Sequence, residues 1–187
     1  MRRHDGIKIK NLRKLFAFLH VFWYNLFNTK KENKQMDINS FEFVDKCSFK
    51  VVGRRAVTPQ PGGTWDVARS DGSIEQMEKL KPEAPMLGIC FGFDENGNND
   101  YMVAIEHTED IEELESYTFP DAKWLVYRAA GSLSENVLGN GWDYVTNTLL
   151  PKYKIRKAQL PTMEIYVNWD KLNNKCEIEI HVPYENE

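Results

Sequence analysis

The sequence has few cysteines and few histidines, and neither kind of residue is grouped. Cys47, Cys90 and Cys176 lie far apart and form no CxxC pair, a pattern that argues against a structural zinc site and against a disulfide framework. We therefore expect three buried, reduced thiols in a cytoplasmic protein. The four histidines are scattered as well, so the sequence predicts no metal site and no cofactor.

Long hydrophobic runs are also missing. The most apolar stretch, residues 15–27, has basic residues on both sides and is shorter than the roughly 20 apolar residues of a membrane-spanning helix. No small-residue cleavage site follows it, which argues against a secretory signal. The apolar side chains of this region recur at helical spacing; they are Leu12, Leu15, Phe16, Leu19, Phe22, Trp23, Leu26 and Phe27.

Two interpretations of residues 1–35 stay open. The region is either a basic amphipathic helix that makes a weak contact with an anionic membrane surface or with a protein, or an extension without a folded role. It is too short to hold a two-helix DNA-reading unit with its supporting helices. In both cases we expect the main domain to span residues 36–187, because Met36 begins a segment with the pattern of a compact domain.

Charge is distributed very unevenly along the chain. The formal net charge is −4, but residues 1–35 carry +7 and the remainder carries −11. An acidic main domain repels phosphates, so we expect no direct binding of nucleic acid by this chain. The same charge favours cationic ligands.

The main domain has the pattern of an α+β protein. Gly- and Pro-rich residues 58–73 are expected to form a loop, and the Asn-Gly in DENGNN indicates a hairpin. The other expected elements are a strand at 47–58, a helix at 73–81, strands at 86–93 and 100–107, a strand at 124–131, a helix at 134–153 stopped by Pro151, and strands at 161–168 and 175–183. The order β-α-β-β thus occurs twice. We expect two antiparallel sheets with helices on one face, and a central ligand channel between their opposite faces.

The last predicted hairpin carries an unusual set of polar residues. The stretch PTMEIYV, residues 161–167, alternates apolar side chains with Glu164 and Tyr166, as a strand does. If the hairpin folds about its middle, one face collects Glu164, Tyr166, Glu177, Glu179 and His181. Acids gathered on one face need a cation, a proton or open water, and the pattern leaves these three open.

Six stretches carry a family resemblance. They are VVGRRAVTPQPGGTW, LGICFGFDENGNNDYMVAIEHTED, YTFPDAKWLVYRAAGS, GWDYVTNTLLPKY, LPTMEIYV and EIEIHVPY. Over roughly residues 40–185 this ordered set resembles the GyrI-like small-molecule-binding domain, the effector-binding module of many bacterial AraC- and MerR-type transcription regulators, which also occurs as a stand-alone protein. The doubled β-α-β-β order agrees with that family's fold, whereas nothing in the sequence matches the family's DNA-binding helix-turn-helix.

The resemblance implies a pocket between the two halves, lined by aromatic side chains and centred on a glutamate. That glutamate matches Glu164, because PTMEIY has the family pattern of proline, two residues, glutamate, one residue and tyrosine. Tyr166 is the tyrosine of this pattern, and a catalytic role for it accompanies Glu164 if the protein is an enzyme. The full set of expected ligand-binding residues is Glu164, Trp65, Tyr101, Trp124, Trp142, Glu179 and His181.

Three functions are compatible with such a pocket. The first is binding of hydrophobic, often cationic, aromatic ligands, including multiple drugs, by a sensor or sequestering module, since a carboxylate and aromatic faces both attract cations. The alternative is a stand-alone hydrolase that opens cyclopropane rings of alkylating natural products with Glu164 as the catalytic carboxylate. The third is a protein-interaction domain like the gyrase inhibitors of this superfamily. Binding and hydrolysis require the same pocket, so the sequence does not separate them.

Overall fold

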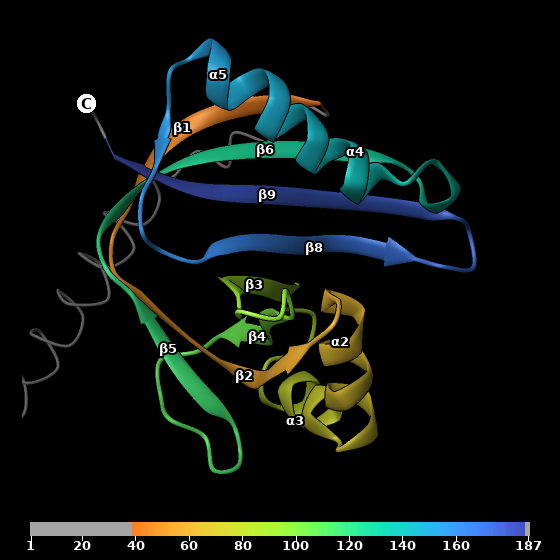
Figure 1. The fold of residues 1–187 in the computed structure, drawn as a ribbon. Coiled ribbons are helices and arrows are strands. Elements are labelled where there is room, and N and C mark those ends of the chain that lie inside the picture. Colours follow the sequence, from red (N-terminus) through yellow and green to blue (C-terminus); the bar gives the residue numbers. More distant parts are fainter. Residues whose placement is uncertain (1–38, 186–187) are drawn as a thin grey trace, which may run out of the picture. The chain divides into compact units, whose positions relative to one another are not determined.

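The computed structural model describes residues 39–185, which form one nine-stranded antiparallel sheet with helices packed on it (Figure 1). The strands are β1 (Ser40–Lys46), β2 (Phe49–Thr58), β3 (Met86–Phe93), β4 (Asn99–Glu106), β5 (Glu115–Phe119), β6 (Ala122–Ser132), β7 (Arg156–Lys157), β8 (Thr162–Asp170) and β9 (Lys175–Glu185). Their order across the sheet is β1-β6-β9-β8-β3-β4-β2-β5, and β7 pairs with β9. The two interpretations of residues 1–35 concern a part of the chain outside the described residues.

The helical elements lie between strands of each half. They are α2 (Pro61–Ser70), α3 (Ser73–Leu80), the 3-10 turn η1 (Leu133–Glu135), α4 (Val137–Tyr144), the π-helical segment η2 (Val145–Leu149) and α5 (Leu150–Lys152). The predicted α+β class is confirmed, and the order β-α-β-β occurs twice, as β2-α2-α3-β3-β4 and β6-α4-β8-β9. None of the helices in residues 39–185 has the length and apolar character needed to cross a membrane.

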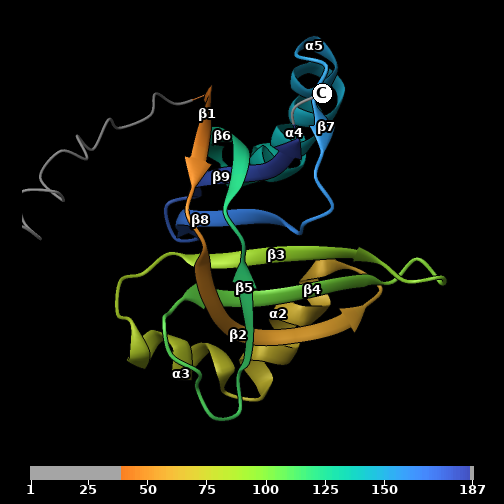
Figure 2. The same cartoon turned by 90° about the vertical axis from the view of Figure 1, so that its left-hand side faces the viewer.

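The two halves share a single sheet, so the prediction of two separate sheets is wrong. Strand β3 of the first half pairs with β8 of the second, from Met86 opposite Tyr166 to Cys90 opposite Thr162. This pairing satisfies backbone groups that would otherwise remain unpaired along two edge strands. The halves also exchange strands, because β1 pairs with β6 and β5 pairs with β2. Figure 2 shows the β1–β2 and β5–β6 segments running from one half to the other.

The Gly- and Pro-rich segment 58–73, expected to be a loop, contains helix α2. Pro61 is the first residue of the helix, a position where the missing N–H of proline costs nothing. Thr64 and Ala68 are fully buried. Packing of these two residues therefore outweighs the low helix propensity of the glycines that follow Pro61.

Within residues 39–185, helices cover only one face of the sheet. On this face α2 and α3 pack on the first half, and α4 and η2 pack on the second (Figure 1). On the opposite face, the described part of the chain contributes strand residues alone. They form a buried cluster of Val51, Leu87, Ile89, Met102, Ala104, Phe119, Trp124, Val126 and Met163. The channel that we expected on this helix-free face is therefore filled by side chains.

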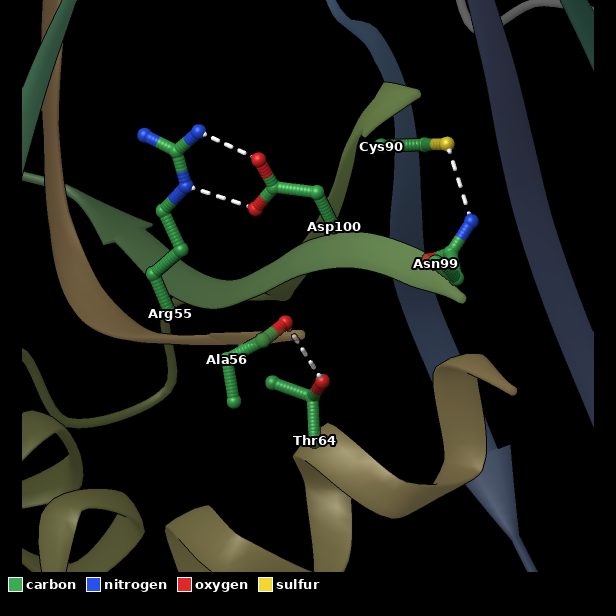
Figure 3. A network of polar contacts seen from close by, with 6 residues as sticks. All are labelled: Arg55, Ala56, Thr64, Cys90, Asn99 and Asp100. Atoms are coloured by element: carbon green, nitrogen blue, oxygen red, sulfur yellow. Dashed lines mark hydrogen bonds and ion pairs between the residues drawn. The ribbon is translucent and has the colours of Figure 1, made fainter. Parts of the chain in front are cut away.

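Polar contacts hold α2 and the β3–β4 hairpin beside β2 (Figure 3). The guanidinium of Arg55 on β2 donates two hydrogen bonds, of 2.7 and 2.6 Å, to the carboxylate of Asp100 on β4. The hydroxyl of Thr64 donates to the carbonyl oxygen of Ala56 at 3.4 Å. Because Thr64 is tied to β2, the next residue of the helix, Trp65, has a defined position over the sheet.

The three cysteines differ in exposure, which corrects the prediction that all three are buried. Cys176 is buried, Cys90 is half-buried and Cys47 is exposed, and none of them forms a disulfide. The side-chain amide of Asn99 donates to the sulfur of Cys90 at 3.3 Å (Figure 3). Only Cys176 therefore has the expected environment.

Candidate functional site

A cavity of about 1060 Å³ lies on the helix-covered side of the sheet. Residues of α2 and α4 form two of its walls, and β8 contributes Glu164, Tyr166 and Trp169. The volume slightly exceeds the range for small-molecule pockets, roughly 300–1,000 Å³. Trp65 of α2 and Trp142 of α4 also line it.

Glu164 lies in the middle of β8 and accepts three hydrogen bonds. The hydroxyls of Tyr101 and Tyr166 donate to Oε2 at 2.6 and 2.8 Å, and the indole N–H of Trp142 donates to Oε1 at 2.6 Å. All three donors are neutral, and within residues 39–185 no Lys, Arg or His forms an ion pair with Glu164. The carboxylate is therefore held in place without a cation from residues 39–185 to balance its charge.

Both tyrosines remain hydrogen-bond donors at neutral pH. Burial is the main cause that raises the pKa of Tyr101 and of Tyr166, and the Glu164 carboxylate raises both values further. A phenol whose pKa lies above its ordinary value of about 10 keeps its proton at pH 7. The two hydroxyl protons are thus available to Glu164.

Gly88 on β3 makes this arrangement possible. It pairs with Glu164 on β8 and with Val103 on β4. A Cβ atom at this position would lie 1.7 Å from the hydroxyl oxygen of Tyr101 and 3.0 Å from Oε2 of Glu164. The absent side chain leaves the space through which Tyr101, on β4, reaches across β3 to Glu164.

Aromatic rings surround Tyr166. Trp65 of α2 lies edge-on to it with ring centroids 5.0 Å apart, and Trp169 lies edge-on at 5.3 Å. Such contacts bury aromatic faces while leaving parts of the rings open to a ligand. Trp169 is 41% exposed, so it forms part of the outer wall of the cavity.

The register of the β8–β9 hairpin corrects the predicted grouping of polar residues. Glu164 lies opposite Ile180, and the register shifts between Tyr166 and Asn168, where Val167 is an extra residue in β8. We expected Glu164 and Glu179 to share one face of this hairpin. A register change of one residue moves a side chain to the other face of the sheet, so Glu164 and Glu179 do not share a face.

Trp124, Glu179 and His181 therefore do not line this cavity. Trp124 is fully buried on the helix-free face, where its ring contacts Phe49 and Phe119. The ring of His181 lies 6.2 Å from that of Trp124.

Of the expected set, Glu164, Trp65, Tyr101 and Trp142 are brought together, and Tyr166 lies with them. Sequence reasoning missed Gly88, although a glycine inside a strand often marks a close approach of another group.

His181 belongs to a separate buried polar network. Its Nδ1 lies 2.9 Å from Nζ of Lys46, and its Nε2 lies 2.9 Å from Oε2 of Glu179. A neutral imidazole that accepts from Lys46 and donates to Glu179 satisfies both contacts. Burial is the main cause that lowers the pKa of His181 to about 4, and the charge of Lys46 acts in the same direction, against the opposing effect of Glu179.

This network predicts acid sensitivity. Because the folded-state pKa of His181 lies below its ordinary value of 6.5, the unfolded chain binds more protons between these values. The stabilisation is present above about pH 6.5 and is lost as the pH falls towards 4. In His181→Gln, the amide keeps one acceptor for Lys46 and one donor for Glu179 but does not titrate.

We expect the parent protein to lose roughly 2–3 kcal/mol more unfolding free energy than His181→Gln between pH 7 and pH 4. Urea denaturation at a series of pH values measures this difference. The other titrating groups are common to both proteins, so parallel pH profiles would contradict the role assigned to His181.

Residues 42–183 match the Cass2 family of integron-associated effector binding proteins. Similar solved structures share the fold. The structure of SAV2435 bound to tetraphenylphosphonium is 19% identical, with a TM-score of 0.64, and the match covers 79% of this chain and 94% of that one. The EcmrR C-terminal domain is 12% identical, with a TM-score of 0.60, and the match covers 79% and 98% of the two chains.

The integron cassette protein VCH_CASS2 from Vibrio cholerae is 14% identical, with a TM-score of 0.59 and coverage of 81% and 100%. No curated protein matches the sequence significantly. At these identities, the structural matches establish the fold, and the family follows from the match that spans most of the chain. The resemblance found in the sequence is thereby confirmed, and the chain belongs to the Cass2 family of GyrI-like effector-binding domains.

Proposed function

We propose that this domain binds hydrophobic aromatic cations and acts as a sensor or a sequestering module. The observation that carries the proposal is Glu164, a carboxylate in an aromatic cavity whose hydrogen-bond donors are all neutral. A bound cation would balance this charge in a partly dehydrated site, where electrostatic attraction is stronger than in water. The faces of Trp65 and Trp142 add cation–π attraction.

The family membership and one relative support this proposal. Effector-binding domains bind small molecules, and the structure of SAV2435 is bound to tetraphenylphosphonium, a hydrophobic cation. The cavity of this chain has the volume for a ligand of that kind. Tetraphenylphosphonium is therefore a suitable probe.

Tryptophan fluorescence tests where the probe binds. We expect tetraphenylphosphonium to quench the emission of the parent protein, because three indoles, those of Trp65, Trp142 and Trp169, line the cavity. The quenched fraction should fall in Trp65→Phe and in Trp142→Phe. It should rise in Trp124→Phe, because that substitution removes an emitting ring on the opposite face of the sheet.

The matched control is a neutral aryl compound such as triphenylphosphine oxide, which should quench only at much higher concentration. Equal quenching by the cation and the neutral compound would remove the carboxylate from the explanation. Quenching that disappears only in Trp124→Phe would place the ligand on the other face and contradict the proposed site.

A further inference from the structure

Most of the hydrogen-bond acceptor capacity of Glu164 is already used by the protein. A carboxylate offers about four lone-pair sites, two on each oxygen. Oε2 accepts from both Tyr101 and Tyr166, and Oε1 accepts from Trp142. One site, on Oε1, is left for a ligand.

The groups around the carboxylate offer few other acceptors. The hydroxyl of Tyr166, which donates to Glu164 and lies 3.5 Å from the hydroxyl of Tyr101, offers one neutral acceptor oxygen. Tyr101 is 1% exposed, so its oxygen is out of reach of a ligand in the cavity. The remaining carboxylates of the lining, Asp66 and Glu83, are exposed, so a cation bound to them stays in water. The inner part of the site thus presents a negative charge and the indole N–H of Trp142, but few acceptors.

We propose that the cavity selects cations that carry no N–H donors, such as quaternary ammonium and phosphonium ions, over primary ammonium and guanidinium ions of similar size. This inference rests on the function proposed above and specifies the class of cation. A primary ammonium has three N–H donors and a guanidinium has five. An N–H group that loses water and finds no acceptor weakens binding. An onium ion has no such groups, yet it keeps the attraction to Glu164 and to the aromatic faces.

The test compares two probes of equal charge, (2-naphthylmethyl)trimethylammonium and (2-naphthylmethyl)ammonium, by isothermal titration calorimetry at pH 7. The methyl groups of the first probe add apolar area, so the ratio of the two dissociation constants in one protein is not decisive. The decisive quantity is the change in that ratio between the parent protein and Tyr166→Phe. This substitution keeps the ring and opens one acceptor site on Oε2 of Glu164.

We expect the preference for the trimethylammonium probe to fall by about three- to tenfold in Tyr166→Phe, because the primary ammonium gains a hydrogen bond to a carboxylate. Any increase in the effective charge of Glu164 acts on both probes and cancels in the ratio. The control is Tyr144→Phe, which removes a phenol of α4 that is 41% exposed. It should leave the ratio unchanged, and thermal melting verifies that each variant is folded.

Each outcome has a distinct meaning. Binding of both probes with the same ratio in the parent and in Tyr166→Phe would overturn the inference while leaving the proposed function intact. A stronger preference for the trimethylammonium probe in Tyr166→Phe than in the parent would also overturn the inference and leave the proposed function intact. Failure of the parent to bind either probe, or tetraphenylphosphonium, would remove the proposed function and this inference with it.

Discussion

Gly88→Ala is expected to destabilise the domain by about 3 kcal/mol and to weaken cation binding at least tenfold. A Cβ at this position would lie 1.7 Å from the hydroxyl oxygen and 2.7 Å from Cζ of Tyr101, and that ring is 1% exposed and closely packed. Overfilling a packed core typically costs 1–3 kcal/mol. Displacing Tyr101 also removes a donor from Glu164, so the carboxylate loses its fixed position.

Thermal melting and calorimetry with tetraphenylphosphonium measure the two effects. For a domain of this size the expected loss lowers the melting temperature by roughly 6–12 °C. Gly62→Ala is the matched control for the melting temperature, because a Cβ at Gly62 meets no atom within 4 Å. Its position inside α2 predicts equal or slightly greater stability, since alanine favours helix more than glycine does.

A double substitution isolates the close approach itself. Tyr101→Phe removes the oxygen nearest to the added Cβ, so Gly88→Ala should cost less in the Tyr101→Phe background than in the parent. Interacting residues give such non-additive effects, whereas independent ones add within a few tenths of a kcal/mol. Simple addition of the two costs would show that the contact between positions 88 and 101 is not the reason for the glycine.

Much of the fold follows from periodicity, and the departures have physical reasons. The alternating strands and the Asn-Gly hairpin between β3 and β4 were correctly predicted. Helix α2 was missed because its first turn is rich in glycine and proline, and local propensity gives no information about the burial of Thr64 and Ala68. Strands β1 and β5 were also missed, because their partners lie far away in the sequence, β6 for one and β2 for the other.

The candidate site was likewise predicted in part and missed in part. The family pattern in PTMEIY predicted Glu164 as a site residue, and the aromatic inventory predicted Trp65, Tyr101 and Trp142. The structure brings these four side chains together about one cavity. The assignment of Glu179 to the same face failed because one extra residue, at Val167, changes the register of the hairpin. A bulge of this kind has no sequence signal here, since no glycine marks it.

In the proposed function the charge of Glu164 attracts a cationic ligand, and Glu164→Gln removes this charge with little change of shape. The glutamine oxygen still accepts from Trp142, while its NH2 group donates to the oxygens of Tyr101 and Tyr166, so we expect the variant to fold. Removing one member of a close charge pair in a binding site typically costs 2 kcal/mol or more. The expected loss of affinity for tetraphenylphosphonium is therefore at least roughly 30-fold.

The most direct measurement is calorimetric titration of the parent and of Glu164→Gln with tetraphenylphosphonium and with triphenylphosphine oxide. We predict that the parent binds the cation far more tightly than the neutral compound. We also predict that the substitution weakens binding of the cation at least roughly 30-fold and leaves binding of the neutral compound within about threefold, a change of less than 1 kcal/mol. Unchanged affinity for the cation in a folded Glu164→Gln variant would contradict the account.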